Sequence, residues 1–227
     1  MKEKRILLTA IGSFSARAII KRLKELGFFV FGMDCYPKEW VVNAALVDGF
    51  IQVPLVSKEE YYEEACFSIV ENRGIDAIFP LTDIEVDYFY KNRKKYEEKG
   101  IVLLLPKGDL SLIRNKYLLG RNLSLSMEKG FSVIEGKGYE EMDFSEPEFP
   151  LVAKLKSGRS SEGLHYIHSD DQLGFFLNQV FREQKEDAYF FQKQIKGKIY
   201  TVDLFRGESG VERALVRREE LRTGNGA

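Results

Sequence analysis

Short apolar runs alternate with segments of helical periodicity over the first hundred residues of the chain. Residues 5–10 and 28–33 are apolar runs of strand length, and residues 15–26 between them carry apolar side chains at the spacing of one helix face. Gly27 follows at a position where helices commonly end. A strand, a helix and a second strand in this order predict two parallel strands joined by a crossover helix.

The alternation continues as far as Pro106. Further strands are predicted at residues 50–53, 77–79 and 101–105, and further helices at residues 58–72 and 82–96. Ser57 is predicted to cap the first of these helices, with Glu60 completing a capping box. We therefore expect an open, mostly parallel α/β domain over residues 1–106.

The chain changes character after Pro106. Asp109 or Ser111 is predicted to cap a helix that runs to about Glu128. Strands are then predicted at residues 151–156 and 164–167, joined by a loop of small and polar residues, and residues 188–194 and 195–205 are predicted to pair as a hairpin. The second half therefore carries a different kind of motif from the first.

Composition and charge exclude several classes of partner. The 227 residues include 34 basic and 35 acidic side chains, and a formal net charge of −1 indicates neither a nucleic acid nor an anionic membrane as a partner. No apolar run approaches the roughly 20 residues of a membrane-spanning helix, and the first residues lack the apolar core of a signal peptide. Two cysteines and two histidines predict neither a disulfide framework nor a metal site. We expect a soluble, cytoplasmic protein.

The carboxyl ends of the first two predicted strands are candidate ligand positions, because parallel sheets bind ligands at this edge. A G-x-G-x-x-G fingerprint centred on Gly12 would place its other glycines at Ala10 and Ser15, so only one of three is present. Asp34 does stand where a ribose-binding acid is expected. A tight turn without a phosphate is the favoured interpretation, and an NAD-linked oxidoreductase domain remains an alternative.

A lysine beside a loop of glycine and serine suggests phosphate chemistry in the second half. Lys154 lies near the end of a predicted strand, and residues 157–163 follow as Ser-Gly-Arg-Ser-Ser-Glu-Gly. Such a loop offers backbone N–H groups that side chains do not obstruct, and a lysine supplies a point charge. The pair is compatible with a phosphate site.

Several motifs occur in a definite order along the chain. Residues 75–85 read Ile-Asp-Ala-Ile-Phe-Pro-Leu-Thr-Asp-Ile-Glu, and Asn115-Lys116 follows further on. The strand Pro-Leu-Val-Ala-Lys ends at Lys154, and residues 191–203 read Phe-Gln-Lys-Gln-Ile-Lys-Gly-Lys-Ile-Tyr-Thr-Val-Asp. In order and spacing these pieces resemble the ATP-grasp superfamily, in its carbamoyl-phosphate-synthase-like branch of carboxylate–amine ligases.

The resemblance implies a fold and a reaction. The expected fold is a Rossmann-like, parallel-sheet pre-ATP-grasp domain over residues 1–106, followed by the N-terminal part of an α+β ATP-grasp domain over residues 107–227. ATP and Mg²⁺ are the implied cofactors, and a small-molecule carboxylate and an amine are the implied substrates. ATP would phosphorylate the carboxylate, and the amine would attack the resulting acyl phosphate. The identity of the substrates is not readable from the sequence.

The resemblance also assigns residues to the phosphates. Lys116 and Lys154 are expected to contact the α- and β-phosphates, because a polyanion needs cations and N–H donors around it. Ser160, Ser161 and Gly163 are expected to close over the phosphates.

The resemblance also implies which residues bind adenine and which bind the substrate. The linker Gln192, Lys193, Gln194 and Ile195 is expected to bind adenine, with backbone groups of Lys193 and Ile195 reading its edge. Asp83 and Glu85, at the ligand edge of the first sheet, are expected to shape a substrate pocket.

Two departures from the family pattern are visible. Ile199 stands where the family has a ribose-binding carboxylate, and a nearby acid, Gln192 or Gln194 is the expected substitute. The acidic Mg²⁺ ligands of the family are expected beyond Ala227, so the second domain is expected to be incomplete and inactive alone, as a piece of a longer protein, a shortened gene product or half of a split enzyme. A homodimer or a complementing C-terminal half are the expected protein partners. A non-catalytic nucleotide- or metabolite-binding remnant is the alternative that both departures favour.

Overall fold

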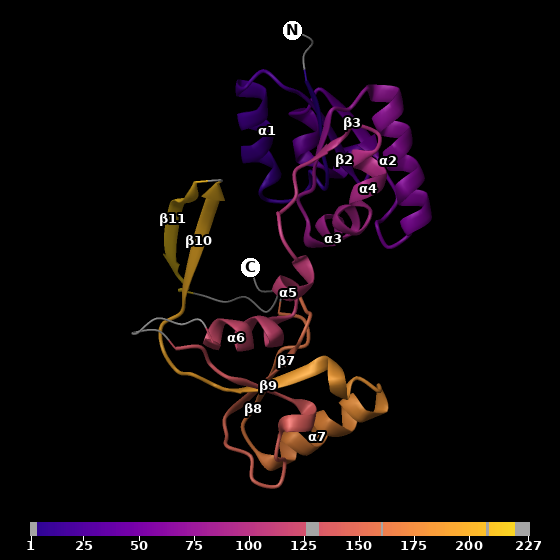
Figure 1. Cartoon of the computed structure of the whole chain (residues 1–227). Helices are drawn as coiled ribbons and strands as arrows, with labels where there is room; N and C mark the ends of the chain where they lie inside the picture. The colour runs from indigo at the N-terminus through magenta and orange to yellow at the C-terminus, as the bar shows by residue number, and fades with distance from the viewer. Residues whose placement is uncertain (1–3, 126–131, 160, 208, 221–227) are drawn as a thin grey trace. The chain divides into compact units, whose positions relative to one another are not determined.

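The computed structural model describes residues 4–125, 132–159, 161–207 and 209–220 (Figure 1). By the contacts within the chain it divides into two compact units, Met1–Gly108 and Asp109–Ala227. Each unit has its own sheet and its own buried core.

The first unit is built on a five-stranded parallel sheet. Its strands are β1 (Arg5–Leu8), β2 (Phe29–Asp34), β3 (Gly49–Gln52), β4 (Ala77–Phe79) and β5 (Val102–Leu103). They lie in the order β3-β2-β1-β4-β5, and every neighbouring pair is parallel. The expected parallel α/β sheet is confirmed. The chain order reverses beside β1, where β2 and β4 flank it, and parallel sheets commonly bind ligands at such a point.

Helices cover this sheet. They are α1 (Ala16–Glu25), α2 (Glu59–Arg73), α3 (Asp83–Lys91) and α4 (Arg93–Glu97), with the short 3₁₀ turns η1 (Lys38–Trp40) and η2 (Val42–Ala45) after β2. Neighbouring residues of β1 enter different cores, because side chains alternate along a strand. Leu7 packs with α2, α3 and α4 residues, whereas Leu8 packs with Ala16 and Ile20 of α1.

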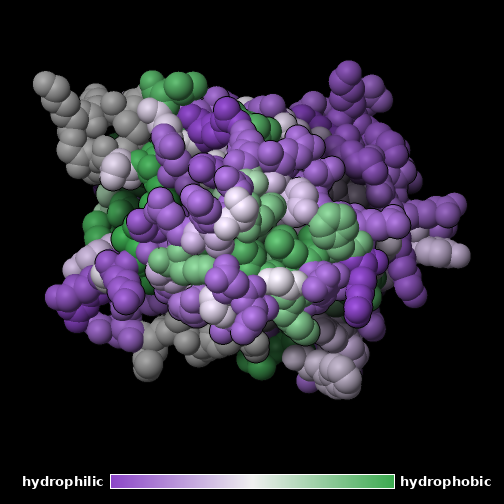
Figure 2. All heavy atoms as spheres, turned by 90° about the horizontal axis from the view of Figure 1, so that it is seen from below, coloured by the Kyte–Doolittle hydropathy of each residue, from purple (hydrophilic) through white to green (hydrophobic). Residues whose placement is uncertain are grey.

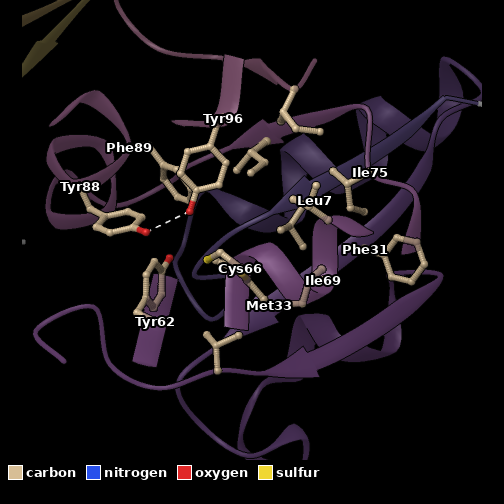
Figure 3. Close-up of a cluster of buried hydrophobic side chains, with 14 residues drawn as sticks. Leu7, Phe31, Met33, Tyr62, Cys66, Ile69, Ile75, Tyr88, Phe89 and Tyr96 are labelled. Atoms are coloured by element: carbon tan, nitrogen blue, oxygen red, sulfur yellow. Dashed lines mark hydrogen bonds between the residues drawn. The ribbon is translucent and has the colours of Figure 1, made fainter. Parts of the chain in front are cut away.

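Aromatic side chains fill the core beneath α2, α3 and α4 (Figure 3). Tyr62 meets Tyr88 edge to face with 5.0 Å between ring centroids, and Phe89 meets Tyr96 at 5.1 Å. The Tyr88 and Tyr96 hydroxyl groups are hydrogen-bonded to each other at 3.0 Å. Burial is the largest cause that raises the pKa of all three tyrosines, and it raises the pKa of Cys66 to about 12, so these groups remain protonated near neutral pH.

Two helix predictions in the first unit are wrong in detail. Lys58 is the N-cap of α2 and makes no side-chain cap, so Ser57 lies one residue too early and the capping box is absent. The helix predicted over residues 82–96 breaks at Asn92 into α3 and α4. The Asn92 amide nitrogen donates to the Tyr88 carbonyl at 3.1 Å, and such local bonds compete with helical ones.

Ion pairs join α2 to the broken helix. Lys91 reaches Glu59 at 2.9 Å and Lys95 reaches Glu63 at 2.6 Å, so two basic residues four apart face two acidic residues four apart. All four side chains are partly exposed, so solvent screens both pairs and each contributes little to stability. The charged segment is therefore a solvated helix face over the aromatic core.

The second unit contains a four-stranded antiparallel sheet in the order β6-β9-β7-β8. Its elements are α5 (Leu110–Arg114), α6 (Lys116–Leu125), β6 (Gly136–Gly138), η3 (Tyr139–Glu141), β7 (Leu151–Leu155), β8 (His165–Ile167), α7 (Asp170–Arg182), η4 (Glu186–Ala188) and β9 (Tyr189–Lys193). Helix α7 packs Leu173, Phe176 and Val180 against one face of this sheet.

The helix predicted from Asp109 is split. Asp109 does cap α5, accepting the Ser111 N–H at 2.8 Å. Asn115 then adopts an extended backbone, and α6 begins at Lys116. The predicted stretch up to Glu128 runs past Leu125 into residues outside those described.

The hairpin predicted from residues 188–194 and 195–205 is wrong. Strand β9 pairs with β7 and β6, whereas β10 (Tyr200–Gly207) pairs with β11 (Gly210–Arg218) in a separate two-stranded ribbon. Strand β9 is largely buried, and so is its partner β7, whereas the linker after β9 is polar and exposed. Pairing with β7 therefore buries the apolar side chains of β9. Apolar side chains of the ribbon are more than half exposed, as for Leu204, Phe205, Leu215 and Val216.

Other apolar side chains are also at the surface. In the first unit Phe14 is fully exposed, and Trp40 is 74% exposed with its ring 6.2 Å from Tyr36. In the second unit Phe175 and Phe181 of α7 are exposed. Seen from below, green apolar atoms gather near the middle of the molecular face among purple hydrophilic ones (Figure 2). None of the helices in the described residues has the length and apolar character required to cross a bilayer.

Two glycines give opposite expectations for stability. Gly74 ends α2 at a φ of +60°, so Gly74→Ala is expected to lower the free energy of unfolding by about 1 kcal/mol. Gly174 lies inside α7 with open space around it, so Gly174→Ala is expected to raise the free energy by about 0.5–1 kcal/mol. Urea unfolding of both variants tests this, and equal effects of the same sign would contradict it.

Candidate nucleotide and substrate sites

Lys154 and Gln192 lie together on the sheet face of the second unit that α7 does not cover. Ala153 and Phe191 enter the core with α7, so their strand neighbours point to the other face. The Lys154 ammonium group donates to Gln192 Oε1 at 2.7 Å, and Gln192 Nε2 donates to the Ile134 carbonyl at 2.6 Å. Two residues that are 38 positions apart in sequence are thus in direct contact.

The Asn115-Lys116 segment is held beside the end of the same strand. The Lys116 N–H donates to the carbonyl of Lys156, two residues after Lys154, at 2.7 Å. Asn115 Oδ1 accepts the Leu118 N–H at 3.0 Å, so the asparagine stabilises the first turn of α6. The two segments predicted to bring cations to the phosphates are therefore joined by a backbone hydrogen bond.

A cluster around Tyr117 attaches α6 to η3, the short turn that follows β6. The Tyr117 hydroxyl donates to Glu141 Oε2 at 2.6 Å, and Arg121 donates to both Tyr117 and Glu141 at 2.7 and 2.9 Å. The Lys156 ammonium lies 5.4 Å from the Tyr117 ring centroid. Sequence reasoning missed this cluster. Its one local signal is the spacing of four between Tyr117 and Arg121, which places them on one helix face.

The loop predicted to cover the phosphates forms tight turns. Glu162 N–H donates to the Arg159 carbonyl at 2.7 Å, and Leu164 N–H donates to the Ser161 carbonyl at 3.2 Å. Ser161 and Gly163 both have φ near +60°, and a Cβ on Gly163 would lie 2.6 Å from Leu155 Cγ. Gly163 is thus required by close packing on the strand that carries Lys154. Ser160 lies outside the described residues.

The predicted adenine linker separates into residues with different surroundings. Lys193 points to the opposite face from Gln192 and pairs with Glu148 at 3.2 Å. The Gln194 N–H donates to the Pro150 carbonyl at 2.9 Å, and its Oε1 is buried with no hydrogen-bond partner among the described residues. Ile195 and Ile199 are exposed by 62% and 48%.

The structure separates the two acids predicted for a substrate pocket in the first unit. Asp83 opens α3 and is exposed. Glu85 is 7% exposed and accepts three hydroxyl groups, from Thr9 at 2.7 Å, Thr82 at 2.7 Å and Tyr62 at 2.9 Å. Glu85 therefore ties β1, α2 and the start of α3 together at the carboxyl edge of the sheet.

Asp34 closes the turn after β1. Its carboxylate accepts the Gly12 N–H at 2.8 Å and the Tyr36 N–H at 3.1 Å. A Cβ on Gly12 would lie 3.0 Å from Asp34 Oδ2. The carboxylate that a dinucleotide site would need for ribose is engaged within the turn itself.

No group of three or more histidine, cysteine, aspartate or glutamate side chains is placed to hold a metal ion within the described ranges. His165 packs its ring 4.9 Å from Phe176, and burial lowers the pKa of this imidazole. Asp203 of β10 is paired with Arg217 of β11 at 2.8 Å.

Sequence comparison relates the chain to a protein family and to a curated ligase. Residues 6–104 match the family described as PylC-like, N-terminal domain. A D-alanine–D-alanine ligase of Bacillus anthracis is 28% identical over 154 residues, covering 62% of this chain and 50% of the relative. The chain thus spans about half the length of the curated relatives it matches.

Solved structures show the same fold. An L-amino acid ligase from Bacillus licheniformis aligns with 99% of this chain and 52% of its own, with a TM-score of 0.69 at 14% identity. Biotin carboxylase from Campylobacter jejuni aligns with 95% of this chain and 50% of its own, with a TM-score of 0.67 at 17% identity. N5-carboxyaminoimidazole ribonucleotide synthetase from Thermotoga maritima aligns with 96% and 54%, with a TM-score of 0.62 at 19% identity.

Proposed function

Because the chain belongs to the ATP-grasp superfamily of carboxylate–amine ligases, we propose that it binds ATP on the Lys154 face of its second unit and takes part in joining a small carboxylate to an amine. The observation that carries the proposal is the Lys154–Gln192 contact beside the bonded Lys116 segment. This arrangement gathers two lysines and a Gly/Ser loop beside the start of the predicted adenine linker.

The proposed reaction has two steps. A carboxylate oxygen of the substrate attacks the γ-phosphorus of ATP, the bond to the β-phosphate oxygen breaks, and ADP leaves. The amine then attacks the acyl carbon, phosphate departs with the C–O bond electrons, and the nitrogen loses a proton. Lys116 and Lys154 would offset the charge that gathers between the two anions in the first step.

Calorimetric titration tests the nucleotide part of this proposal. ATP and ADP are expected to bind the chain, and NADH is expected to bind more weakly than either, since only Gly12 of the three glycines of the dinucleotide fingerprint is present. A preference for NADH would overturn the proposal in favour of a dinucleotide-binding domain. Absence of binding by all three nucleotides would overturn it as well.

A non-catalytic nucleotide-binding protein is the second candidate. Ile199 favours it, because an isoleucine cannot accept hydrogen bonds from ribose hydroxyl groups. In that case ATP would bind without turnover when carboxylate, amine and Mg²⁺ are supplied. Turnover in the longest available form of the protein would exclude this candidate.

Placing a carboxylate at position 199 is expected to tighten nucleotide binding. A hydrogen bond to a charged group contributes about 1.5–3 kcal/mol, so Ile199→Glu should lower the Kd for ATP by roughly 10- to 150-fold. Val202→Glu is the matched control, because Val202 is an equally exposed apolar residue three positions along. Calorimetry measures both. Equal gains in the two variants, or a loss in Ile199→Glu, would contradict a ribose at this position.

A further inference from the structure

A cavity lies wholly within the first unit, at the carboxyl edge of its parallel sheet. It has a volume of about 180 Å³, and it is bordered by Ala10 in the turn after β1, by Asp34 at the end of β2 and by the loop after β3. An engineered cavity of about 150 Å³ in another protein holds benzene, so this space suits a ligand of roughly six heavy atoms.

Most of the cavity wall is apolar. Val53, Pro54, Leu55 and Val56 come from the loop after β3, and Ile84 comes from the first turn of α3. Leu55 and Ile84 are 54% and 51% exposed, whereas Val53 is 5% exposed. Leu55 and Ile84 therefore border the open side of the cavity, and Val53 lies deeper. Apolar side chains thus line the path from solvent inward, which suits an aliphatic chain.

The ionisable groups of the wall include two carboxyl groups and no basic side chain. Asp34 and Glu85 are 6% and 7% exposed, and the remaining polar lining comes from Cys35, Tyr62 and Thr82. Burial and the Asp34 carboxylate raise the pKa of the Cys35 thiol, so it stays neutral near pH 7. The buried end of the cavity is thus negative without a protein cation to balance it.

The two carboxylates retain hydrogen-bonding capacity. Glu85 accepts three hydroxyl donors, and Asp34 accepts the Gly12 and Tyr36 N–H groups. A carboxylate has about four lone-pair positions, so each has room for at least one further donor. The existing donors also fix both carboxylates in place, which reduces the entropy lost when a ligand binds.

We propose that this cavity binds the ammonium end of a small aliphatic amine, with the alkyl part against Val53, Leu55 and Ile84 and the charge toward Asp34 and Glu85. A carboxylate or phosphate end would meet two like charges and no cation, so the cavity discriminates against the acidic substrate and against nucleotide. If the proposed ligase function holds, the occupant is the amine substrate or an amino-bearing part of a substrate. The binding itself does not depend on nucleotide.

A series of probes of equal length and different charge tests the proposal. The ¹⁵N-labelled full chain is titrated with n-butylammonium, n-butanol and n-butyrate, and the amide signals of Cys35 and Ile84 are followed by NMR. We expect saturable shifts with butylammonium, at least tenfold weaker binding of butanol, and no saturable shift with butyrate. Equal binding of butylammonium and butanol, tighter binding of butyrate, or no binding by any probe would overturn the proposal.

Two variants and one control test whether the probes bind in this cavity. Asp34→Asn keeps an oxygen for the Gly12 N–H and removes one charge, so butylammonium should lose most of its advantage over butanol. Leu55→Trp narrows the open side from an exposed position and should weaken all binding at least tenfold, whereas Ile113→Trp, at an exposed site in the second unit, should change nothing. Unchanged binding in Leu55→Trp would overturn the location, even if Asp34→Asn fails to fold. Because no arm contains nucleotide, failure here is distinct from failure to bind ATP.

Discussion

Lys154→Ala is expected to weaken ATP binding by roughly 10- to 150-fold. The ammonium group is held by Gln192 on the sheet face that α7 does not cover, near the end of the strand that leads into the Gly/Ser loop. A charge-assisted hydrogen bond to phosphate contributes about 1.5–3 kcal/mol, and removing its donor loses that free energy. Calorimetric titration of the variant with ATP and ADP measures the loss.

Lys193→Ala is the matched control for this experiment. Lys193 belongs to the neighbouring strand of the same sheet, but its side chain points to the opposite face and pairs with Glu148. Both variants remove one positive charge, so a general electrostatic effect would appear in both. Only Lys154→Ala should lose affinity, and the proposed site would be wrong if the two variants behaved alike.

Phe89→Ala is expected to lower the free energy of unfolding of the first unit by about 3–5 kcal/mol. Phe89 is fully buried and meets three tyrosine rings, Tyr62, Tyr88 and Tyr96, at centroid distances of 6.3, 5.0 and 5.1 Å (Figure 3). Truncation leaves a cavity among rigid rings that cannot close it without breaking the Tyr88–Tyr96 hydrogen bond. Urea unfolding followed by circular dichroism gives the change.

Phe14→Ala provides the comparison. Phe14 is fully exposed in the turn after β1, so the same chemical change should alter the free energy of unfolding by no more than about 0.5 kcal/mol. If Phe89→Ala cost less than about 1 kcal/mol, the aromatic core would be loosely packed and the description of the first unit would be wrong.

The parallel sheet of the first unit could be predicted because its signal is local. Each strand is a short apolar run closed by a turn residue, and each helix has its own apolar face. The helix breaks at Asn92 and Asn115 could not be read from periodicity, since both segments keep their apolar spacing across the break. In each case an asparagine amide bonds to the backbone, and the sequence shows only that this is available, not that it is used.

The candidate site was predictable in part for the same reason. Lys116 and Lys154 stand in motifs that resemble a known family, and that family resemblance is confirmed. The roles assigned to these lysines remain predictions. The pairing of β9 with β7 instead of β10 depends on which strands find each other across about 40 residues, and alternation alone does not decide that.

Glu85 shows a different limit. Its sequence context indicates a ligand-edge acid, and it does lie at that edge, but Thr9 and Tyr62 approach it from 76 and 23 positions away. Glu85 is predicted to contact substrate, but the hydroxyl groups that donate to it come from side chains of its own unit. Asp34 behaves similarly with Gly12, 22 positions away. These hydrogen bonds join residues that are distant in sequence, so the spacing of residues along the chain does not predict them.

The exposed Trp40 beside Tyr36 gives the chain a built-in optical label. The chain has one tryptophan, so selective excitation of indole reports on the loop after β2 alone and receives no tryptophan signal from the second unit. This loop begins at Asp34, beside the apolar cavity of the first unit. Emission from Trp40 can therefore distinguish ligand binding in the first unit from the nucleotide binding that we propose for the second, in the unmodified protein and without an added dye.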